Sequence, residues 1–305
     1  MRKLLFCILA SSLLSGCFFT GVESTPKITA SDVRKAETPV TAEDTFLSRV
    51  ADAPLAEWRP GKRFLVTDPR ISLIFPSAGA DADSLEGRVI TFAGASESVG
   101  VTGSGVTDLT FVSPHGRELV YRVSRPMASL MKSESLSVPF TIQTDMVGMA
   151  DRLMRGQRYY VLTSLWRDDE ENTVRERKFI PVVIDSVTPG SAVFPLKASF
   201  HDTEGRPGKL FFNPGAKSDN MRTFASLFAF GDPRRQYPQI TDEVWELITR
   251  GRVRAGMTLV ECRLALGAPR EVTHGASYGY LREVWQYESG IYLLFEDGRL
   301  KEYRR

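Results

Sequence analysis

Residues 256–269, GMTLVECRLALGAP, constrain the fold of this 305-residue chain more than any other stretch, because they predict one short helix with both ends defined. Thr258 and Glu261 have the spacing of a capping box, in which each side chain accepts a hydrogen bond from the backbone N–H of the other residue. Gly267 allows the left-handed backbone that ends many helices, and Pro269 prevents the helix from resuming.

The same helix predicts which of its side chains are buried. Leu259, Cys262 and Leu266 are spaced three and four positions apart, so they share one apolar face. Cys262 is therefore interpreted as a small core residue rather than a reactive thiol. A second helix is predicted just upstream, in residues 240–251, with Thr241 as its N-cap.

Two β-hairpins are predicted after the helices, with turns at Ser289-Gly290 and Asp297-Gly298. Two-residue turns would place Val284 opposite Phe295 and Trp285 opposite Leu294, and directly opposed residues share a sheet face. One face would then be mainly aliphatic, with Val284, Ile291, Leu293, Phe295 and Leu300. The other would be mainly aromatic, with Trp285, Tyr287, Tyr292, Leu294 and Tyr303. We expect the two helices to cover the aliphatic face.

The order of two helices and a meander resembles the SmpA/OmlA (BamE-like) domain family, whose fold is shared in outline by the β-lactamase inhibitor proteins. The residues that carry the resemblance are Gly256-Met257-Thr258, Val260, Leu266-Gly267-x-Pro269, Trp285-x-Tyr287, Leu294-Phe295 and Asp297-Gly298. It covers about residues 238–305 and implies an ααβββ domain at 239–305. Family members of the assembly-factor type carry this domain close behind a lipid anchor, whereas roughly 200 residues intervene here.

The predicted aromatic face needs a cover of its own. The chain could supply it from its β-rich region or from the segment FASLFAF at 224–230, or the two faces could be exchanged. A protein partner is the functional alternative, because Trp and Tyr are frequent anchors of interfaces. The candidate partner face is therefore Trp285, Tyr287, Tyr292, Leu294 and Tyr303.

The N-terminus has the layout of a secretory signal, with a basic head, an apolar run too short to span a membrane, and small residues before Cys17. Leu14-Ser15-Gly16-Cys17 resembles the bacterial lipoprotein signal. That resemblance implies removal of the signal peptide 1–16 and lipid attachment to Cys17, although an ordinary signal with a chance cysteine is the alternative. Phe18, in place of the Asp that retains many lipoproteins at the inner membrane, favours the outer membrane.

The charge balance excludes a broad electrostatic attraction to nucleic acid. The chain has 39 Lys and Arg and 37 Asp and Glu, and removal of Arg2 and Lys3 with the signal peptide leaves a net charge of 0. Among unmodified cysteines of the mature chain only Cys262 remains, so no disulfide is available.

Strand-like runs separated by turn residues fill the middle of the chain. We expect a flexible tether over 17–50, two β-rich units of SH3-like or small-barrel type at 51–135 and 136–215, and a connector at 216–238 that docks by its aromatic residues. The related strings GKRFLV and GQRYYV begin similar strand pairs in the two units. They indicate either an internal duplication or convergent strand chemistry.

The sequence predicts no catalytic residues, metal site or cofactor. The three histidines, His115, His201 and His274, lack partners at metal-ligand spacing. The charge run RDDEENTVRER at 167–177 is interpreted as a solvated hairpin tip.

The combined expectation is an α+β multidomain protein, non-enzymatic and lipid-anchored in the outer membrane, facing the periplasm. It would act in scaffolding or protein–protein interaction with an envelope partner. A cell-wall or glycan-binding lipoprotein and a proteinaceous enzyme inhibitor are the alternatives, and the oligomeric state is left open.

Overall fold

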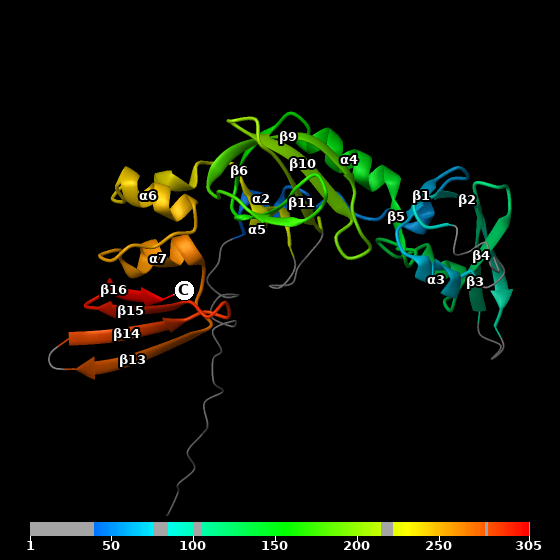
Figure 1. Cartoon of the computed structure of the whole chain (residues 1–305). Coiled ribbons are helices and arrows are strands. Elements are labelled where there is room, and N and C mark those ends of the chain that lie inside the picture. Colours follow the sequence, from blue (N-terminus) through cyan, green and yellow to red (C-terminus); the bar gives the residue numbers. More distant parts are fainter. Residues whose placement is uncertain (1–39, 76–84, 101–104, 215–221, 278–279, 305) are drawn as a thin grey trace, which may run out of the picture. The chain divides into compact units, whose positions relative to one another are not determined.

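The computed structural model describes residues 40–75, 85–100, 105–214, 222–277 and 280–304. The predicted signal peptide and Cys17 lie outside these residues. The described chain is mixed and strand-rich, with three antiparallel sheets and three hydrophobic cores (Figure 1). None of its helices has both the length and the apolar character needed to cross a membrane.

The first sheet is built around a cluster of aromatic rings. Its strands are β1 (Arg63–Val66), β2 (Val89–Val99), β3 (Gly105–Val112), β4 (Glu118–Val123) and β5 (Thr141–Gln143). The short helices η1 (Leu55–Glu57), η2 (Pro69–Leu73) and α3 (Met127–Leu130) flank it. The Phe111 ring lies 5.2 Å from that of Phe64 and 5.8 Å from that of Phe92, centroid to centroid. These contacts place large apolar surfaces in one core.

The second sheet packs against the longest described helix. Its strands are β6 (Arg158–Val161), β7 (Leu165–Arg167), β8 (Thr173–Arg175), β9 (Ile180–Pro189), β10 (Leu196–Asp202), β11 (Pro207–Phe212) and β12 (Phe228–Ala229). Buried and half-buried residues alternate along β10, as expected when one strand face meets a core. Helix α4 (Thr144–Met154) lies along β9 (Figure 1) and buries Met146, Val147, Ala150 and Met154.

The two sheets share one strand order. The first runs β5-β1-β2-β3-β4, and the second runs β12-β6-β9-β10-β11 before the added hairpin β7-β8. The related sequence strings stand at equivalent places, because Gly61 and Gly156 both have positive φ, of 93° and 74°. Each donates its backbone N–H to the next long strand, at Phe92 and Ile184. Glycine is favoured at both positions because it adopts positive φ without strain, and the shared order supports a duplication.

Residues 41–50 are folded, so the expectation of a tether is wrong for them. Helix α2 (Ala42–Thr45) starts with a capping box between Thr41 and Asp44. Leu47 and Val50 are 2% and 0% exposed and belong to the core of the second sheet. A short helix with two buried aliphatic residues gives too little periodicity to be read from the sequence.

The predicted connector contributes to the second sheet. Helix α5 (Phe224–Leu227) is buried at Phe224, and β12 directly after it pairs with β6. The Phe224 ring lies 5.1 Å from the Tyr159 ring, so this segment does dock through its aromatic residues. The short helix η4 (Pro233–Gln236) follows.

The C-terminal part begins with the two predicted helices, α6 (Asp242–Thr249) and α7 (Leu259–Leu266). The α7 capping box is confirmed: the N–H of Thr258 lies 2.7 Å from Glu261 Oε2, and the N–H of Glu261 lies 3.3 Å from Thr258 Oγ1. Cys262 is fully buried, which confirms it as a core residue, and burial with the nearby Glu261 carboxylate raises its pKa to about 12.

The C-terminal sheet has one more strand than the expected ααβββ order. Its meander runs β13 (Glu271–Ser277), β14 (Tyr280–Gln286), β15 (Tyr292–Glu296) and β16 (Arg299–Arg304). His274 lies within β13, beside two residues that are uncommon in strands. Gly275 and Ala276 have low strand propensity, and pairing with β14 overrides it.

Candidate functional site

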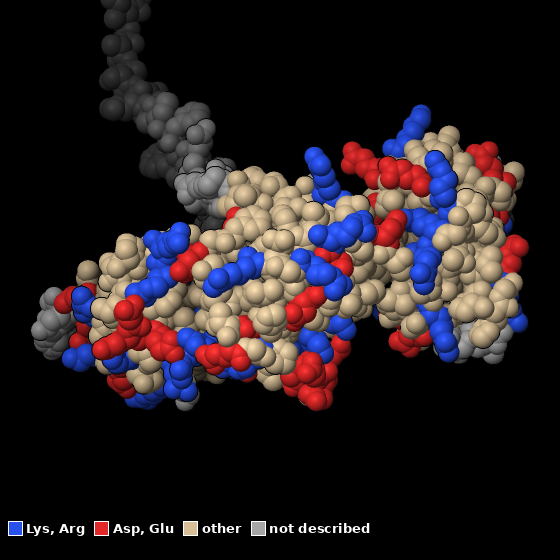
Figure 2. Space-filling view, turned by 90° about the horizontal axis from the view of Figure 1, so that it is seen from above, with Lys and Arg blue, Asp and Glu red and all other residues tan. Residues whose placement is uncertain are grey.

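A concentration of arginines stands out locally in a surface of balanced charge. On the face seen in Figure 2, lysines and arginines are interspersed with aspartates and glutamates, and neither sign forms a broad patch there. By contrast, five arginines line a single cavity of about 550 Å³, together with two glutamates, an apolar pair and a hairpin tip. The lining is Arg175, Glu176, Arg177, Glu204, Arg206, Arg250, Gly251, Arg252, Leu266, Ser289 and Ile291.

Two Arg-x-Arg segments supply four of these arginines. Residues 175–177 lie at the end of β8 and just after it, and residues 250–252 follow α6. Gly251 has a φ of 62°, which ends the helix and is favourable for glycine. The Arg175 guanidinium lies close to it, with Nη1 3.8 Å from the place a Cβ of Gly251 would occupy. Glycine is favoured here by its positive φ, since these contacts are at ordinary van der Waals distance.

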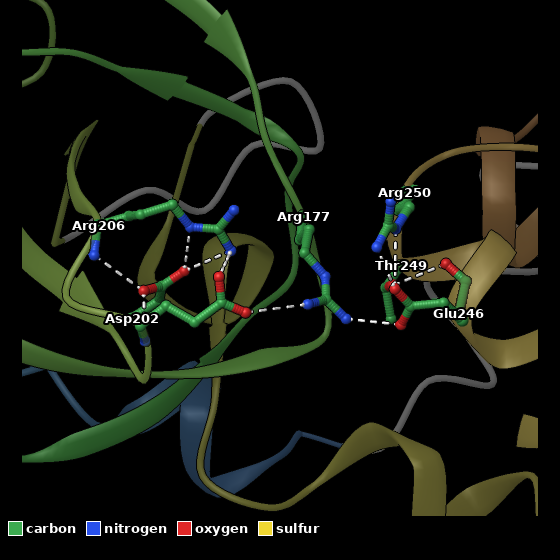
Figure 3. Close-up of polar contacts among 7 residues, drawn as sticks. Arg177, Asp202, Arg206, Glu246, Thr249 and Arg250 are labelled. Atoms are coloured by element: carbon green, nitrogen blue, oxygen red, sulfur yellow. Dashed lines mark hydrogen bonds and ion pairs between the residues drawn. The ribbon is translucent and has the colours of Figure 1, made fainter.

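One carboxylate joins the two segments. Glu246 Oε2 accepts a hydrogen bond of 2.7 Å from Arg177 Nη2, and Glu246 Oε1 lies 2.7 Å from Arg250 Nη2 (Figure 3). Arg177 also reaches Glu204, at 3.7 Å. These side chains are partly exposed, so the ion pairs contribute modest stability and serve mainly to fix geometry.

Asp202 fixes the fifth arginine of the cavity, Arg206. Its carboxylate is buried and accepts hydrogen bonds from the backbone and side chain of Arg206 and from the backbone of Glu204 (Figure 3). Burial acts to raise the pKa of Asp202, but these hydrogen bonds outweigh it and hold the pKa below its ordinary value. Arg206 is thereby held in a fixed orientation.

Two arginines of the cavity have no ion pair with any residue that the structure describes: Arg175 and Arg252. Both are exposed. The Nε of Arg177 is buried without a hydrogen-bond partner among the described atoms. The cavity therefore retains cationic hydrogen-bond donors that its own carboxylates do not satisfy.

Lys178 adds a further cation next to the cavity. Its side chain is 9% exposed and lies over the Phe179 ring, 5.1 Å from the centroid. Burial, together with repulsion from Arg175, lowers the pKa of Lys178 to about 8. Burial is the larger cause of this shift, and Arg175 adds a like charge beside Lys178.

The five residues of the predicted partner face do not lie together on one face of the C-terminal sheet. Tyr287 donates its N–H to the Ile291 carbonyl at 2.9 Å, so the first hairpin has a three-residue loop rather than a two-residue turn. Trp285 then pairs with Leu293 instead of Leu294. A slip of one residue exchanges the two faces of one strand relative to its partner strand. The predicted register and faces are therefore wrong.

The helices cover a mixed face that includes Trp285. Its side chain is 1% exposed and its ring lies 4.8 Å from that of Phe295. The Tyr287 hydroxyl donates to the Gly267 carbonyl at 3.2 Å, and burial raises the Tyr287 pKa. Leu293, Phe295 and Leu300 do lie in this core, as expected, whereas Val284 pairs with Leu294 on the opposite face.

Leu294, the fourth predicted partner residue, is only 6% exposed. Tyr292 is half-buried and Tyr303 is exposed. Contact of these two tyrosines with a partner stays a prediction.

The histidines do not gather into a site. His115 lies exposed in a turn, His201 lies 2.7 Å from Asp185, and His274 lies 3.7 Å from Glu283. Within the described part of the chain, no group of three or more His, Cys, Asp or Glu side chains has an arrangement that could hold a metal ion.

The sequence interpretation missed the arginine cavity. The run RDDEENTVRER does form a hairpin turn, over Asp168–Asn172, but its last three residues leave the solvated tip and face the C-terminal part. The available signal was the second Arg-x-Arg string at 250–252, directly after a helix end. Nothing in the sequence indicates that the two strings meet.

Comparisons with protein-family models, with curated proteins and with solved structures find no match for this chain.

Proposed function

We propose that the chain is a non-enzymatic, lipid-anchored protein of the outer membrane, facing the periplasm, which acts in scaffolding by binding an envelope protein partner. The anchor is Cys17, at the end of a lipoprotein-type signal. In this proposal the tether lies before the capping box of α2 at Thr41.

The proposed architecture is two SH3-like units followed by an SmpA/OmlA-like domain. The shared strand order of the first two sheets and the two equivalent glycines support the duplicated unit. The sequence of two helices and a meander in residues 239–305 supports the second assignment. Fold analogy alone says little about function, so the binding role rests on the site.

The single observation that carries the binding role is the arginine-lined cavity. Two Arg-x-Arg segments from distant parts of the chain lie at one cavity, and Arg175 and Arg252 lack an ion pair among the described residues. Arginine is strongly favoured at protein interfaces, because its planar guanidinium binds carboxylates in a defined geometry. A partner that brings an acidic group would satisfy these donors.

In-cell crosslinking followed by capture and mass spectrometry tests the binding role. The wild type is expected to recover an envelope protein that the double variant Arg175→Gln, Arg252→Gln loses. The matched control is Arg88→Gln, Arg235→Gln, which removes two exposed arginines away from the cavity. Equal recovery by both double variants, or no envelope protein with any of them, contradicts the proposal.

The anchor is tested separately. Cells fed an alkyne-bearing palmitate are expected to label the wild type but not Cys17→Ala, and mass spectrometry is expected to find the acyl groups on the first residue of the mature chain. Labelling that survives in Cys17→Ala contradicts lipid attachment at that residue.

A further inference from the structure

One carboxylate outside the cavity lining already binds an arginine of each Arg-x-Arg segment. Glu246 is held between two guanidiniums, with 2.7 Å contacts to Arg177 and to Arg250. These are one arginine from each Arg-x-Arg segment. A carboxylate is thus the group that fits between the two segments at this spacing.

The remaining arginine of each segment, Arg175 and Arg252, also lines the cavity, and neither has an ion pair among the described residues. Arg175 lies near the second segment, with Nη1 3.8 Å from the place a Cβ of Gly251 would occupy. Like charges in one cavity repel each other, and a bound anion lowers that cost.

The cavity carries a small excess of positive charge. Five arginines belong to the lining, and four carboxylates either line it or pair with its arginines, namely Glu176, Asp202, Glu204 and Glu246, which leaves a net charge of +1 before the adjacent Lys178 is counted. This charge balance favours an anionic group in the cavity.

The apolar lining adds a second requirement. Leu266 at the end of α7 and Ile291 beside the first C-terminal hairpin are half-buried and face the same cavity. A ligand that buries an aliphatic group here removes that surface from water, with a gain of about 25 cal/mol per Å². A small free anion leaves it exposed.

We infer that the cavity binds an acidic segment of a partner protein, with one carboxylate between Arg175 and Arg252 and a neighbouring aliphatic side chain against Leu266 and Ile291. This inference rests on the proposed binding role and names the chemistry of the partner. Glu246 is the internal counterpart of the incoming carboxylate. The binding requires no change in the ion pairs of Arg177 or Arg206.

Isothermal titration calorimetry with the detergent-solubilised protein tests the inference. The probes are the blocked peptide acetyl-Ala-Leu-Glu-Leu-Ala-amide, its counterpart with Gln in place of Glu, and inorganic phosphate. The Glu peptide is expected to bind at least about tenfold more tightly than the Gln peptide, because a charge-assisted hydrogen bond is lost. Arg175→Gln and Arg252→Gln are each expected to weaken it by about tenfold, and Arg88→Gln is expected to leave it unchanged.

The outcomes separate the inference from the proposed function. Equal binding of the two peptides, tighter binding of phosphate than of the Glu peptide, or binding that survives both cavity substitutions overturns the acidic segment as the ligand. If crosslinking in cells still depends on Arg175 and Arg252 in those cases, the binding role stands and only its chemistry is overturned. Ile291→Asn is expected to weaken both peptides and to leave phosphate binding unchanged, and an unchanged affinity for the Glu peptide overturns the apolar contact.

Discussion

At the residue scale, Gly208 occupies a position in the second core that leaves no room for a side chain. A Cβ on Gly208 would lie 2.6 Å from Cε3 of Trp166 and 2.8 Å from two ring atoms of Phe200. Both aromatic side chains are fully buried. Neither ring has space to move, because protein cores are close-packed.

Gly208→Ala is therefore expected to lower the free energy of unfolding by about 1–3 kcal/mol, the usual cost of overpacking. Urea unfolding followed by tryptophan fluorescence measures this. Gly94→Ala is the matched control, because a Cβ there meets no atom within 4 Å. An equal effect of the two substitutions would contradict the contacts with Trp166 and Phe200 as the source of the cost.

Lys178 lowers the free energy of unfolding by an amount that depends on pH. Burial and the neighbouring Arg175 lower its pKa to about 8 in the folded chain, against 10.5 for an exposed lysine. The unfolded chain therefore binds more protons than the folded chain between these two pH values. The destabilisation by Lys178 is largest below about pH 8 and decreases as the pH rises toward 10.5.

Lys178→Met is accordingly expected to be more stable than the wild type at pH 7, by about 2–3 kcal/mol. The advantage is expected to shrink by pH 10. Urea unfolding of both proteins at the two pH values measures it. A difference that does not change with pH would contradict titration of Lys178 as its source.

At the element scale, short segments at the borders of the units contribute residues to the cavity and to the second core. The hairpin β7-β8 is the addition that distinguishes the second sheet from the first, and the chain that leaves it carries Arg175 and Arg177 to the cavity. Helix α2 likewise is only four residues long, yet the turn after it buries Leu47 and Val50.

Leu47→Ala tests whether this segment belongs to the fold. A cavity in the second core is expected to lower the free energy of unfolding by about 2–5 kcal/mol. Val40→Ala, at a residue that is 77% exposed, is expected to have no measurable effect. If the two variants unfold at the same urea concentration as the wild type, residues 41–50 act as tether after all.

At the scale of the whole molecule, three consecutive residues join the second core to the third. Arg177 contacts Glu246, the Lys178 N–H donates to the Thr249 carbonyl at 2.9 Å, and the Phe179 ring lies 5.7 Å from that of Trp245. Phe179 has a φ of 58°, an unfavourable backbone for a bulky residue. Its contacts on both sides hold it there.

A double-mutant cycle with Phe179→Leu and Trp245→Leu measures this contact. The coupling free energy is expected to be about 0.5–1.5 kcal/mol, as for other aromatic pairs. Urea unfolding of the wild type and the three variants supplies it. Additive effects would mean that the two rings do not stabilise the junction.

The sequence by itself determined the features that depend on neighbouring residues. The capping box of α7, the positive-φ glycines that end both C-terminal helices, and the burial of Cys262 all follow from the chemistry of a few adjacent positions. The related strings at Gly61 and Gly156 were visible for the same reason. A glycine just before a strand is a local signal that can be read before any tertiary contact is known, whereas the hydrogen bonds of Gly61 to Phe92 and of Gly156 to Ile184 join distant residues.

Only the tertiary structure decided what depends on distant residues. The three-residue loop after Tyr287 fixed the sheet register and put Trp285 in the core, against the simpler two-residue turn. The cavity needs two arginine segments that are about 75 positions apart in the chain, and each of them alone resembles a solvated charge run. Packing and electrostatic fit between such segments depend on their positions in space, which local propensities do not encode.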